Sequence, residues 1–251
     1  TTHKLVDVVR DRKSYNLKRY FYRFEPKTRL KVKTISIDMY LPYIQLIKEM
    51  FPNAKIIIDP FHIVQALNRE LNRTRVRVMN KHRYKDPKLY RKLKHYWKLI
   101  LKNPNELQNY KYNRYKLFES FITSKGIVDY ILEKNPSLKN DYEVVHSLRE
   151  CIQDRDYIEF KETIEAATQL DLSPGLKRVL KTLMTYLPYI QNTCEYPTRT
   201  NGPIEGINNK IKVLKRNAYG FRNYYHFRNR IILITKMFGP KQKGIKQQLV
   251  A

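Results

Sequence analysis

Two short runs of aliphatic and β-branched residues, each followed at once by an aspartate, constrain the fold most. Lys33–Ile37 precedes Asp38, and Lys55–Ile58 precedes Asp59. Residues 40–51 between them carry apolar side chains at helical spacing. Strand, helix and strand in this order form a βαβ unit, whose two strands are parallel neighbours. We therefore predict an α/β fold in which both aspartates lie at the carboxyl edge of the sheet, where such sheets bind ligands.

The remainder of the chain shows mainly helical periodicity, so we expect a predominantly helical protein. A further strand is predicted at Leu5–Val9, and a helix at Pro60–Asn80. Residues 1–80 then form an α/β part, residues 81–195 an all-helical insertion without strands, residues 196–238 closing helices, and residues 239–251 a loose basic tail. Within the insertion, one helix is predicted at Tyr115–Lys125. Helix starts and stops are predicted at Asp86-Pro87, Asn103-Pro104, Asn135-Pro136 and Ser173-Pro174.

The charge of the chain requires a polyanionic partner. It has 50 Lys and Arg residues against 23 Asp and Glu residues, a net charge of +27. Nucleic acid is the first candidate for such a partner, and an anionic membrane surface is a weaker alternative. No apolar run approaches the 18 residues or more of a membrane-spanning helix, so we expect no membrane partner. Cys151 and Cys194 form neither a disulfide framework nor a zinc pattern, which favours a reducing cytoplasm.

The segment Asn201–Lys212 contains the most unusual string of residues. If it is helical, its apolar side chains gather on one side and Glu205 lies among polar residues on the other. The polar face comprises Glu205, Asn208, Asn209, Lys212 and Arg216. Glu205 suits a structural role beside the positive end of the helix. Gly206, however, weakens the first turn without an evident structural return, which favours a functional role for this face.

The two aspartates and the helix after Asp59 also allow two interpretations each. Asp38 and Asp59 can cap the helices that follow them. His62, Arg69, Arg73 and Arg77 share one edge of their helix. That edge is either an ordinary solvated face or a surface that holds a DNA backbone.

Together, Asp38 and Glu205 indicate a divalent-metal site for phosphodiester chemistry. The histidines show no close pair with metal-ligand spacing, so a hard ion held by carboxylates is expected. Two Mg²⁺ ions, replaceable by Mn²⁺, would activate the attacking oxygen and stabilise the leaving oxygen.

Five strings carry a resemblance to a known family. They are Ser36–Tyr40, Ile58–Val64, Asn201–Lys212, Tyr219–Asn223 and Phe227–Arg230. Together they resemble the DDE transposases of bacterial insertion sequences, of the L-three type. The resemblance implies a ribonuclease H-like catalytic core with a helical insertion, which cleaves element ends and transfers strands to target DNA. It also implies metal binding and catalysis by Asp38 and Glu205, a supporting role for Asp59 and His62, and a homodimer assembled on double-stranded DNA in the bacterial nucleoid.

The chain departs from the family at the first catalytic aspartate, which lies in an Asp-Glu pair on the first core strand. No such pair precedes Asp38, and Asp7 lies on a strand that resembles a different one. We therefore expect an N-terminally truncated copy that binds DNA but does not catalyse transposition alone. The alternatives are a non-catalytic DNA-binding remnant and an unrelated basic protein associated with RNA, which would leave Asn201–Lys212 unexplained.

Overall fold

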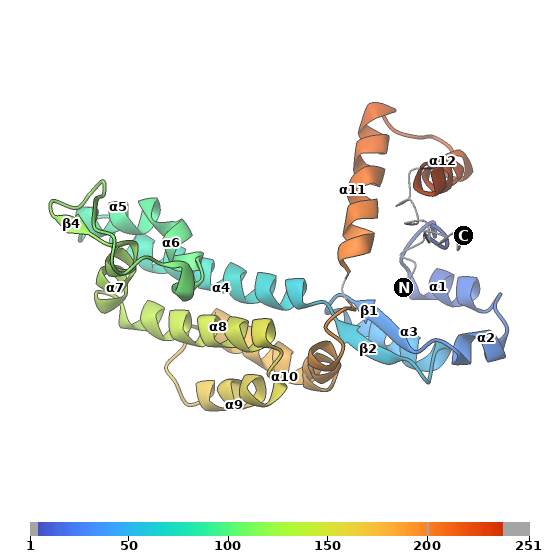
Figure 1. Ribbon diagram of the computed structural model, residues 1–251, viewed down its shortest axis with the longest axis horizontal. Coiled ribbons are helices and arrows are strands. Elements are labelled where there is room, and N and C mark those ends of the chain that lie inside the picture. Colours follow the sequence, from blue (N-terminus) through green and yellow to red (C-terminus); the bar gives the residue numbers. More distant parts are fainter. Residues whose placement is uncertain (1–4, 200, 238–251) are drawn as a thin grey trace, which may run out of the picture. The chain divides into compact units, whose positions relative to one another are not determined.

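The computed structural model describes residues 5–199 and 201–237, and its described part is mostly helical (Figure 1). The chain divides into two compact units. One comprises residues 1–33, 41–54 and 200–251, and the other comprises residues 34–40 and 55–199. The predicted tail at residues 239–251 lies outside the described residues. None of the described helices is long and apolar enough to cross a membrane.

The larger unit contains two small sheets and most of the helices. Its elements are β1 (Thr34–Ile37), β2 (Lys55–Ile58), α4 (Pro60–Lys81), α5 (Pro87–His95), α6 (Trp97–Leu101), the 3₁₀ turn η1 (Pro104–Glu106), β3 (Asn113–Arg114), β4 (Phe121–Ile122), α7 (Ser124–Glu133), α8 (Pro136–Asp154), α9 (Tyr157–Ala167) and α10 (Pro174–Glu195). The smaller unit contains α1 (Ser14–Phe21), α2 (Pro26–Leu30), α3 (Leu41–Met50), α11 (Gly202–Asn217) and α12 (Tyr224–Met237).

The parallel pairing of the two predicted strands is confirmed. β1 and β2 pair in register from Thr34 opposite Lys55 to Ile37 opposite Ile58. Helix α10 covers the outer edge of β2 with side chains in place of a third strand. Thr193 Oγ1 accepts a hydrogen bond from Ile58 N at 3.1 Å and donates one to Ile58 O at 2.7 Å. A sheet edge satisfied in this way is closed to further strand pairing.

Helix α4 is the spine of the helical part, and α8 and α10 pack along it (Figure 1). Its apolar side chains Ile63, Leu67 and Leu71 are fully buried. Buried Glu70 lies against the first turn of α10, because a Cβ added at Gly175 would meet Glu70 Oε1 at 1.7 Å. The positive end of α10 therefore helps to stabilise this carboxylate.

Several predicted helix boundaries are confirmed by capping contacts. Asp86 and Ser173 each accept a hydrogen bond from the third amide of the helix they begin, and Asn103 begins the 3₁₀ turn η1. α10 continues through Pro188, which lies inside it, to Glu195. The continuation is stabilised by packing against β2, which local sequence does not show.

The prediction that residues 81–195 contain no strand is wrong. β3 and β4 form a short antiparallel hairpin where a helix was expected at Tyr115–Lys125. The aromatic residues at positions 112, 115, 118 and 121 have a spacing that suits a helix face, but aromatic side chains also favour strands. Leu117 turns the chain with a left-handed φ of 72°, and the Tyr96 hydroxyl donates a hydrogen bond to the carbonyl of Lys116.

The smaller unit corrects a second prediction, because Leu5–Val9 does not form a strand. The segment is held by side chains. The Tyr224 hydroxyl donates a hydrogen bond to the carbonyl of Val8. Arg228 binds the carboxylate of Asp7 through Nε and Nη2, each at 2.7 Å. These contacts satisfy an extended segment without strand pairing. Alongside it, α1 packs on α3 through rings that include Phe21 and Phe51.

Candidate functional site

The carboxyl ends of β1 and β2 place Asp38 and Asp59 next to each other in the larger unit. Ile37 and Ile58 are paired across the two strands, and the following amide, Asp59 N, donates to Ile37 O at 3.0 Å. The hydrogen bonding between the two strands therefore extends as far as the two aspartates. The prediction that both lie at this edge of the sheet is confirmed.

The two aspartates differ in exposure and therefore in what they can do. Asp59 is only 3% exposed and accepts a hydrogen bond from Phe61 N at 2.9 Å, so it caps α4. The side chain of Asp38 is 55% exposed. A carboxylate at this exposure can be reached by solvent, an ion or a phosphate. The capping role considered for Asp59 is confirmed, and Asp38 is the accessible carboxylate of the pair.

His62 connects α4 with the end of β1. Its Nε2 lies 2.7 Å from Asp38 Oδ1, and its side chain is 27% exposed. Nε2 donates a hydrogen bond to the carboxylate when it carries a proton, and the contact becomes an ion pair when the ring is charged. His62 therefore fixes the orientation of Asp38. The sequence placed His62 near the sheet edge but gave no sign of this direct contact.

Glu205 belongs to the smaller unit, where it lies exposed in the first turn of α11. The other residues predicted for its polar face are exposed as well, namely Asn208, Asn209, Lys212 and Arg216. The helix itself is confirmed, and it runs from Gly202 to Asn217. That Glu205 meets Asp38 stays a prediction.

The arginine edge of α4 has a structural role that the sequence did not reveal. Arg73 Nη1 and Arg77 Nη2 lie 3.3 and 3.0 Å from the two carboxylate oxygens of Glu70. Because Glu70 is buried, these arginines neutralise a charge that would otherwise be costly to bury. Arg69 instead donates to Gln65 Oε1 at 3.2 Å. The side chains of Arg73 and Arg77 remain 66% and 46% exposed, so they can also contact phosphate.

Asp7 is committed to an ion pair within the smaller unit. Its side chain is only 14% exposed beside Arg228. Burial alone would raise the pKa of Asp7, but hydrogen bonds from Val8 N, Arg228 and Tyr20 outweigh it and hold that pKa below its ordinary value. The charge of this carboxylate is therefore already compensated by Arg228.

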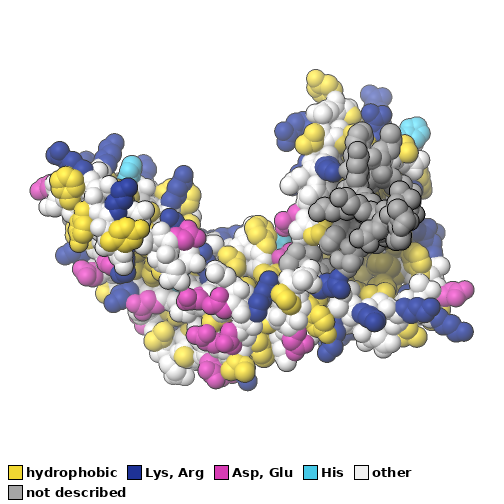
Figure 2. Space-filling model, viewed as in Figure 1, with side chains coloured by type: hydrophobic (Ala, Val, Ile, Leu, Met, Phe, Trp, Pro, Cys, Tyr) yellow, Lys and Arg dark blue, Asp and Glu magenta, His cyan; other side chains and the backbone are white. Residues whose placement is uncertain are grey.

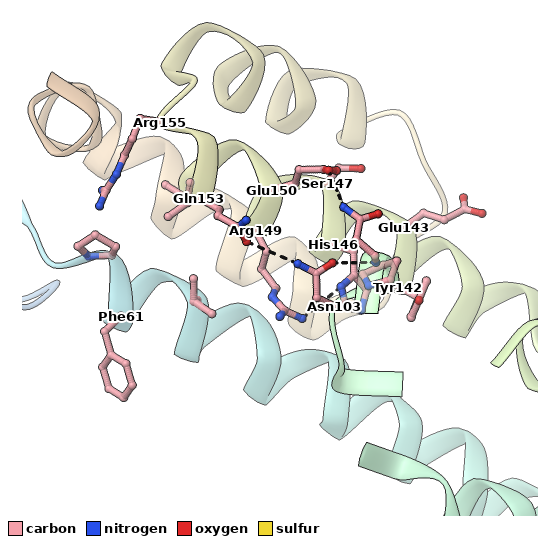
Figure 3. Close-up of a pocket in the computed structure, with 15 residues that line it drawn as sticks. Phe61, Asn103, Tyr142, Glu143, His146, Ser147, Arg149, Glu150, Gln153 and Arg155 are labelled. Atoms are coloured by element: carbon pink, nitrogen blue, oxygen red, sulfur yellow. Dashed lines mark hydrogen bonds between the residues drawn. The ribbon is translucent and has the colours of Figure 1, made fainter. Parts of the chain in front are cut away.

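A cavity of about 610 Å³ lies between the start of α4, the η1 turn and α8 (Figure 3). It begins at Pro60 and Phe61, directly after Asp59. Figure 3 shows His146 and Arg149 projecting from α8 toward the loop that carries Asn103. Neither residue is predicted as a site residue from the sequence, although their positions three apart on one helix are a recognisable signal.

His146 makes the stability of the protein sensitive to acid. Burial lowers the pKa of His146 to about 4. Its Nε2 lies 3.1 Å from Ile100 O and its Nδ1 lies 3.1 Å from Arg149 Nη1, so the neutral ring satisfies both neighbours. A second proton on the ring would displace the hydrogen bond from Arg149 and place two positive charges side by side.

We expect the free energy of unfolding to fall by about 2 kcal/mol between pH 7.5 and pH 5 through this residue. The pKa is depressed in the folded state, so protons favour the unfolded chain once the pH drops below about 6.5, and the loss grows until the pH reaches the folded value. Urea unfolding at several pH values measures the slope. His146→Gln should reduce it, whereas His95→Gln, on the exposed face of α5, should leave it unchanged. Equal slopes in all three proteins would contradict the assignment.

Comparison with known proteins places the chain in a family. Residues 1–231 match the family DDE_Tnp_ISL3, described as a transposase. The chain is 30% identical over 213 residues to the transposase for insertion sequence element IS1001 of Bordetella parapertussis, which covers 83% of this chain and 48% of that protein. It is 36% identical over 130 residues to a protein of Lactococcus lactis subsp. lactis named ATP-dependent protease, covering 52% of this chain and 40% of that protein.

The chain thus spans less than half the length of these two relatives. No solved structure matches it. The match to the transposase family extends through both sets of predicted site residues, from the strand that precedes Asp38 to the helix that carries Glu205. The chain belongs to the ISL3-type transposase family.

Proposed function

We propose that the chain forms part of the catalytic domain of an insertion-sequence transposase, which cleaves DNA at element ends and transfers the strand to target DNA. The observation that carries this proposal is the exposed carboxylate of Asp38, held by His62 at the carboxyl edge of a parallel sheet. This is the position at which α/β proteins bind ligands. A ribonuclease H-like core around β1 and β2 is part of the proposal.

Asp38 and Glu205 are the proposed metal ligands and catalytic residues. Both are accessible carboxylates, which suit Mg²⁺ and Mn²⁺ because these ions prefer oxygen ligands. When bound, two such ions would supply an activated attacking oxygen and a stabilised leaving oxygen. His62 would keep the carboxylate of Asp38 oriented, and Asp59 would hold the start of α4 in place.

The open side of β1 is a candidate position for a third carboxylate. Within the described residues, β1 pairs only with β2, and all four of its residues remain partly exposed. We propose that a further strand carrying the family's first aspartate pairs with this side, and that the 251 residues alone do not catalyse strand transfer. Asp7 does not replace it, because its charge is compensated by Arg228.

The DNA substrate is proposed to contact exposed residues of both units. Candidates are Arg69, Arg73 and Arg77 on α4, and Asn208, Asn209, Lys212 and Arg216 on α11. Each phosphate contact releases counterions, so affinity for duplex DNA should fall steeply with salt. Because transposition joins two element ends, a homodimer assembled on DNA in the bacterial nucleoid is the proposed active form.

Gly206 provides a test of whether the start of α11 is shaped for DNA. Within its own unit, an added Cβ would meet no atom within 4 Å. Gly206→Ala should therefore raise the free energy of unfolding of α11, by up to about 1 kcal/mol. We expect the same variant to weaken the binding of element-end DNA, because the missing side chain leaves room for the phosphate backbone.

The measurement combines thermal unfolding with DNA binding by fluorescence anisotropy. Asn217→Ala, at the other end of the same helix, is the control, since it also replaces a residue in α11 far from Glu205. If Gly206→Ala stabilised the chain and left DNA binding unchanged, the glycine would have no role in approach to DNA.

The direct test of the proposed function is a cleavage assay. Supercoiled plasmid carrying insertion-sequence ends is incubated with the 251 residues or with a longer protein, which is the same chain extended by the proposed strand that carries the first aspartate. Each protein is assayed with Mg²⁺ and with chelator. Mg²⁺-dependent nicking at the ends by the longer protein is the expected result. DNA binding by both proteins without nicking would favour the alternative, a non-catalytic DNA-binding remnant.

A further inference from the structure

The helical part of the larger unit is divided by charge along the sequence. Residues 81–125 contain 13 Lys and Arg residues and three Asp and Glu residues. Residues 126–195 contain eight Lys and Arg residues against 12 Asp and Glu residues. Figure 2 shows the same division in space, with Lys and Arg gathered around α5 and β4 and with Asp and Glu along α8 and α9. Positive charge is therefore concentrated at one end of this unit.

These cations are mostly available for a ligand. Among the described residues of the segment 81–125, Lys102 and Lys125 form ion pairs, with Glu106 and Asp129. Lys88 and Arg91 on α5 are exposed and pair with no carboxylate within the described part of the chain. Unpaired cations this close together repel one another, so an anionic ligand would relieve their repulsion.

Aromatic side chains are exposed among the same cations. Tyr84, Tyr110, Tyr112 and Phe121 are 85%, 79%, 64% and 68% exposed. Phe121 lies in β4, opposite Arg114 of β3, and Tyr112 directly precedes β3. Large aromatic rings exposed at a strongly basic surface indicate a ligand that stacks on them. A nucleic acid fits both features, because its phosphates are anionic and its bases have flat faces that stack on aromatic rings.

Residues of this basic segment also line a cleft. It has a volume of about 650 Å³ and is lined by α5, α7 and the loop into β4, with Lys88, Arg91, Lys92, Phe118, Phe121 and Tyr130 on its walls. Lys92 Nζ lies 4.2 Å from the ring centre of Phe118 and 4.1 Å from that of Tyr130. Leu117, with its left-handed backbone, also lines the cleft. A non-glycine residue held in this conformation is typical of ligand clamps.

We propose that this α5–β4 cleft binds an unpaired nucleotide of single-stranded DNA. Lys88 and Arg91 neutralise the phosphates on either side of it, and the exposed ring of Phe121 stacks on the base. A duplex would use the cations alone, because its bases are hidden in the stack. The rings and the cleft thus favour an unpaired strand. The inference rests on the proposed function only in taking DNA as the nucleic acid.

The test compares single-stranded and duplex DNA. Anisotropy is measured with a fluorescein-labelled 20-nucleotide thymidine strand and with a 20-base-pair duplex, using the whole chain. Phe121→Ala should weaken binding of the single strand about tenfold and change duplex binding less than about twofold. Tyr15→Ala is the matched control, because Tyr15 is 72% exposed on α1, in the smaller unit. It should change neither affinity.

The charges are tested separately with Lys88→Ala/Arg91→Ala. This double variant should weaken the binding of both single-stranded and duplex DNA and lower the salt dependence of both affinities. The control Lys177→Ala/Lys181→Ala removes two exposed cations from α10 and should change neither the affinities nor their salt dependence. If Phe121→Ala weakened the binding of single-stranded and duplex DNA equally, or weakened neither, the assignment of an unpaired nucleotide would be overturned.

A second readout locates the strand. A single strand containing 5-iododeoxyuridine should crosslink under ultraviolet light to peptides within residues 110–130, and crosslinks confined to other segments would overturn the proposal. Since Phe121 is remote in sequence from Asp38 and Glu205, the nicking assay reports on the catalytic proposal independently. Crosslinking to residues 110–130 without any nicking by the longer protein would contradict the catalytic proposal and leave the nucleotide-binding proposal in place.

Discussion

Asp38→Asn and Glu205→Gln are each expected to lower Mg²⁺-dependent cleavage by the longer protein about 10³-fold, equivalent to about 4 kcal/mol of transition-state stabilisation. Each change removes a negative charge and retains the size of the side chain. With one anionic ligand lost, the proposed site would hold its ions less tightly. Gel assays of plasmid nicking measure the rate, and anisotropy measures DNA affinity, which should stay within about twofold of the unaltered protein because the cations are unchanged.

Glu162→Gln is the matched control, since it neutralises an exposed carboxylate on α9. It should leave both the cleavage rate and the DNA affinity as they are. Cleavage by Glu205→Gln at the rate of the control would remove Glu205 from the site. Loss of folding in either variant would show as a shifted melting temperature and would call for Asp38→Glu, which keeps the charge and should retain part of the activity.

Thr193→Val should be among the most destabilising conservative changes in the chain. Val has nearly the shape of Thr but lacks the hydroxyl. In the unaltered protein this hydroxyl joins α10 to β2 by hydrogen bonds to both the N–H and the carbonyl of Ile58. Ile58 is fully buried, so water does not replace the lost partner. Leaving these buried groups unsatisfied is expected to reduce the free energy of unfolding by about 2 to 3 kcal/mol.

Urea unfolding measures this effect as a shift of the midpoint at a constant slope. Thr185→Val on the same helix is the control, because the hydroxyl of Thr185 is exposed and bonds only to the preceding turn at Lys181 O. Its effect should stay within about 0.5 kcal/mol. An equally small effect in Thr193→Val would mean that α10 does not close the edge of β2 through this contact.

The sequence predicts those parts of the fold whose causes are local. The βαβ unit follows from two aliphatic runs with a helical segment between them, and the helix starts at Asp86 and Ser173 follow from capping side chains. The failed prediction of a strand at Leu5–Val9 has a long-range cause. Leu5–Val9 has the composition of a strand, but its groups are satisfied by Tyr224 and Arg228, more than 200 positions away.

The same distinction holds for the candidate site. That Asp38 and Asp59 share one edge follows from strand order, because parallel strands end on the same side. The contact between His62 and Asp38 depends on the rotation of α4 about its axis, which tertiary packing sets. The pairing of Arg73 and Arg77 with Glu70 also could not be predicted from the sequence. Helical spacing places the arginines on one edge of α4 but does not show that Glu70 is buried.

Iron-mediated cleavage of the protein tests most directly the proposal that Asp38 and Glu205 hold the same metal ions. Fe²⁺ bound in place of Mg²⁺ generates hydroxyl radicals with ascorbate and peroxide, which cut the nearby backbone. We predict two groups of cuts in the longer protein, one next to Asp38 and one next to Glu205, both abolished by excess Mg²⁺ and both lost in Asp38→Asn. Cuts next to Asp38 alone, or cuts next to Glu205 that persist in Asp38→Asn, would contradict a shared site.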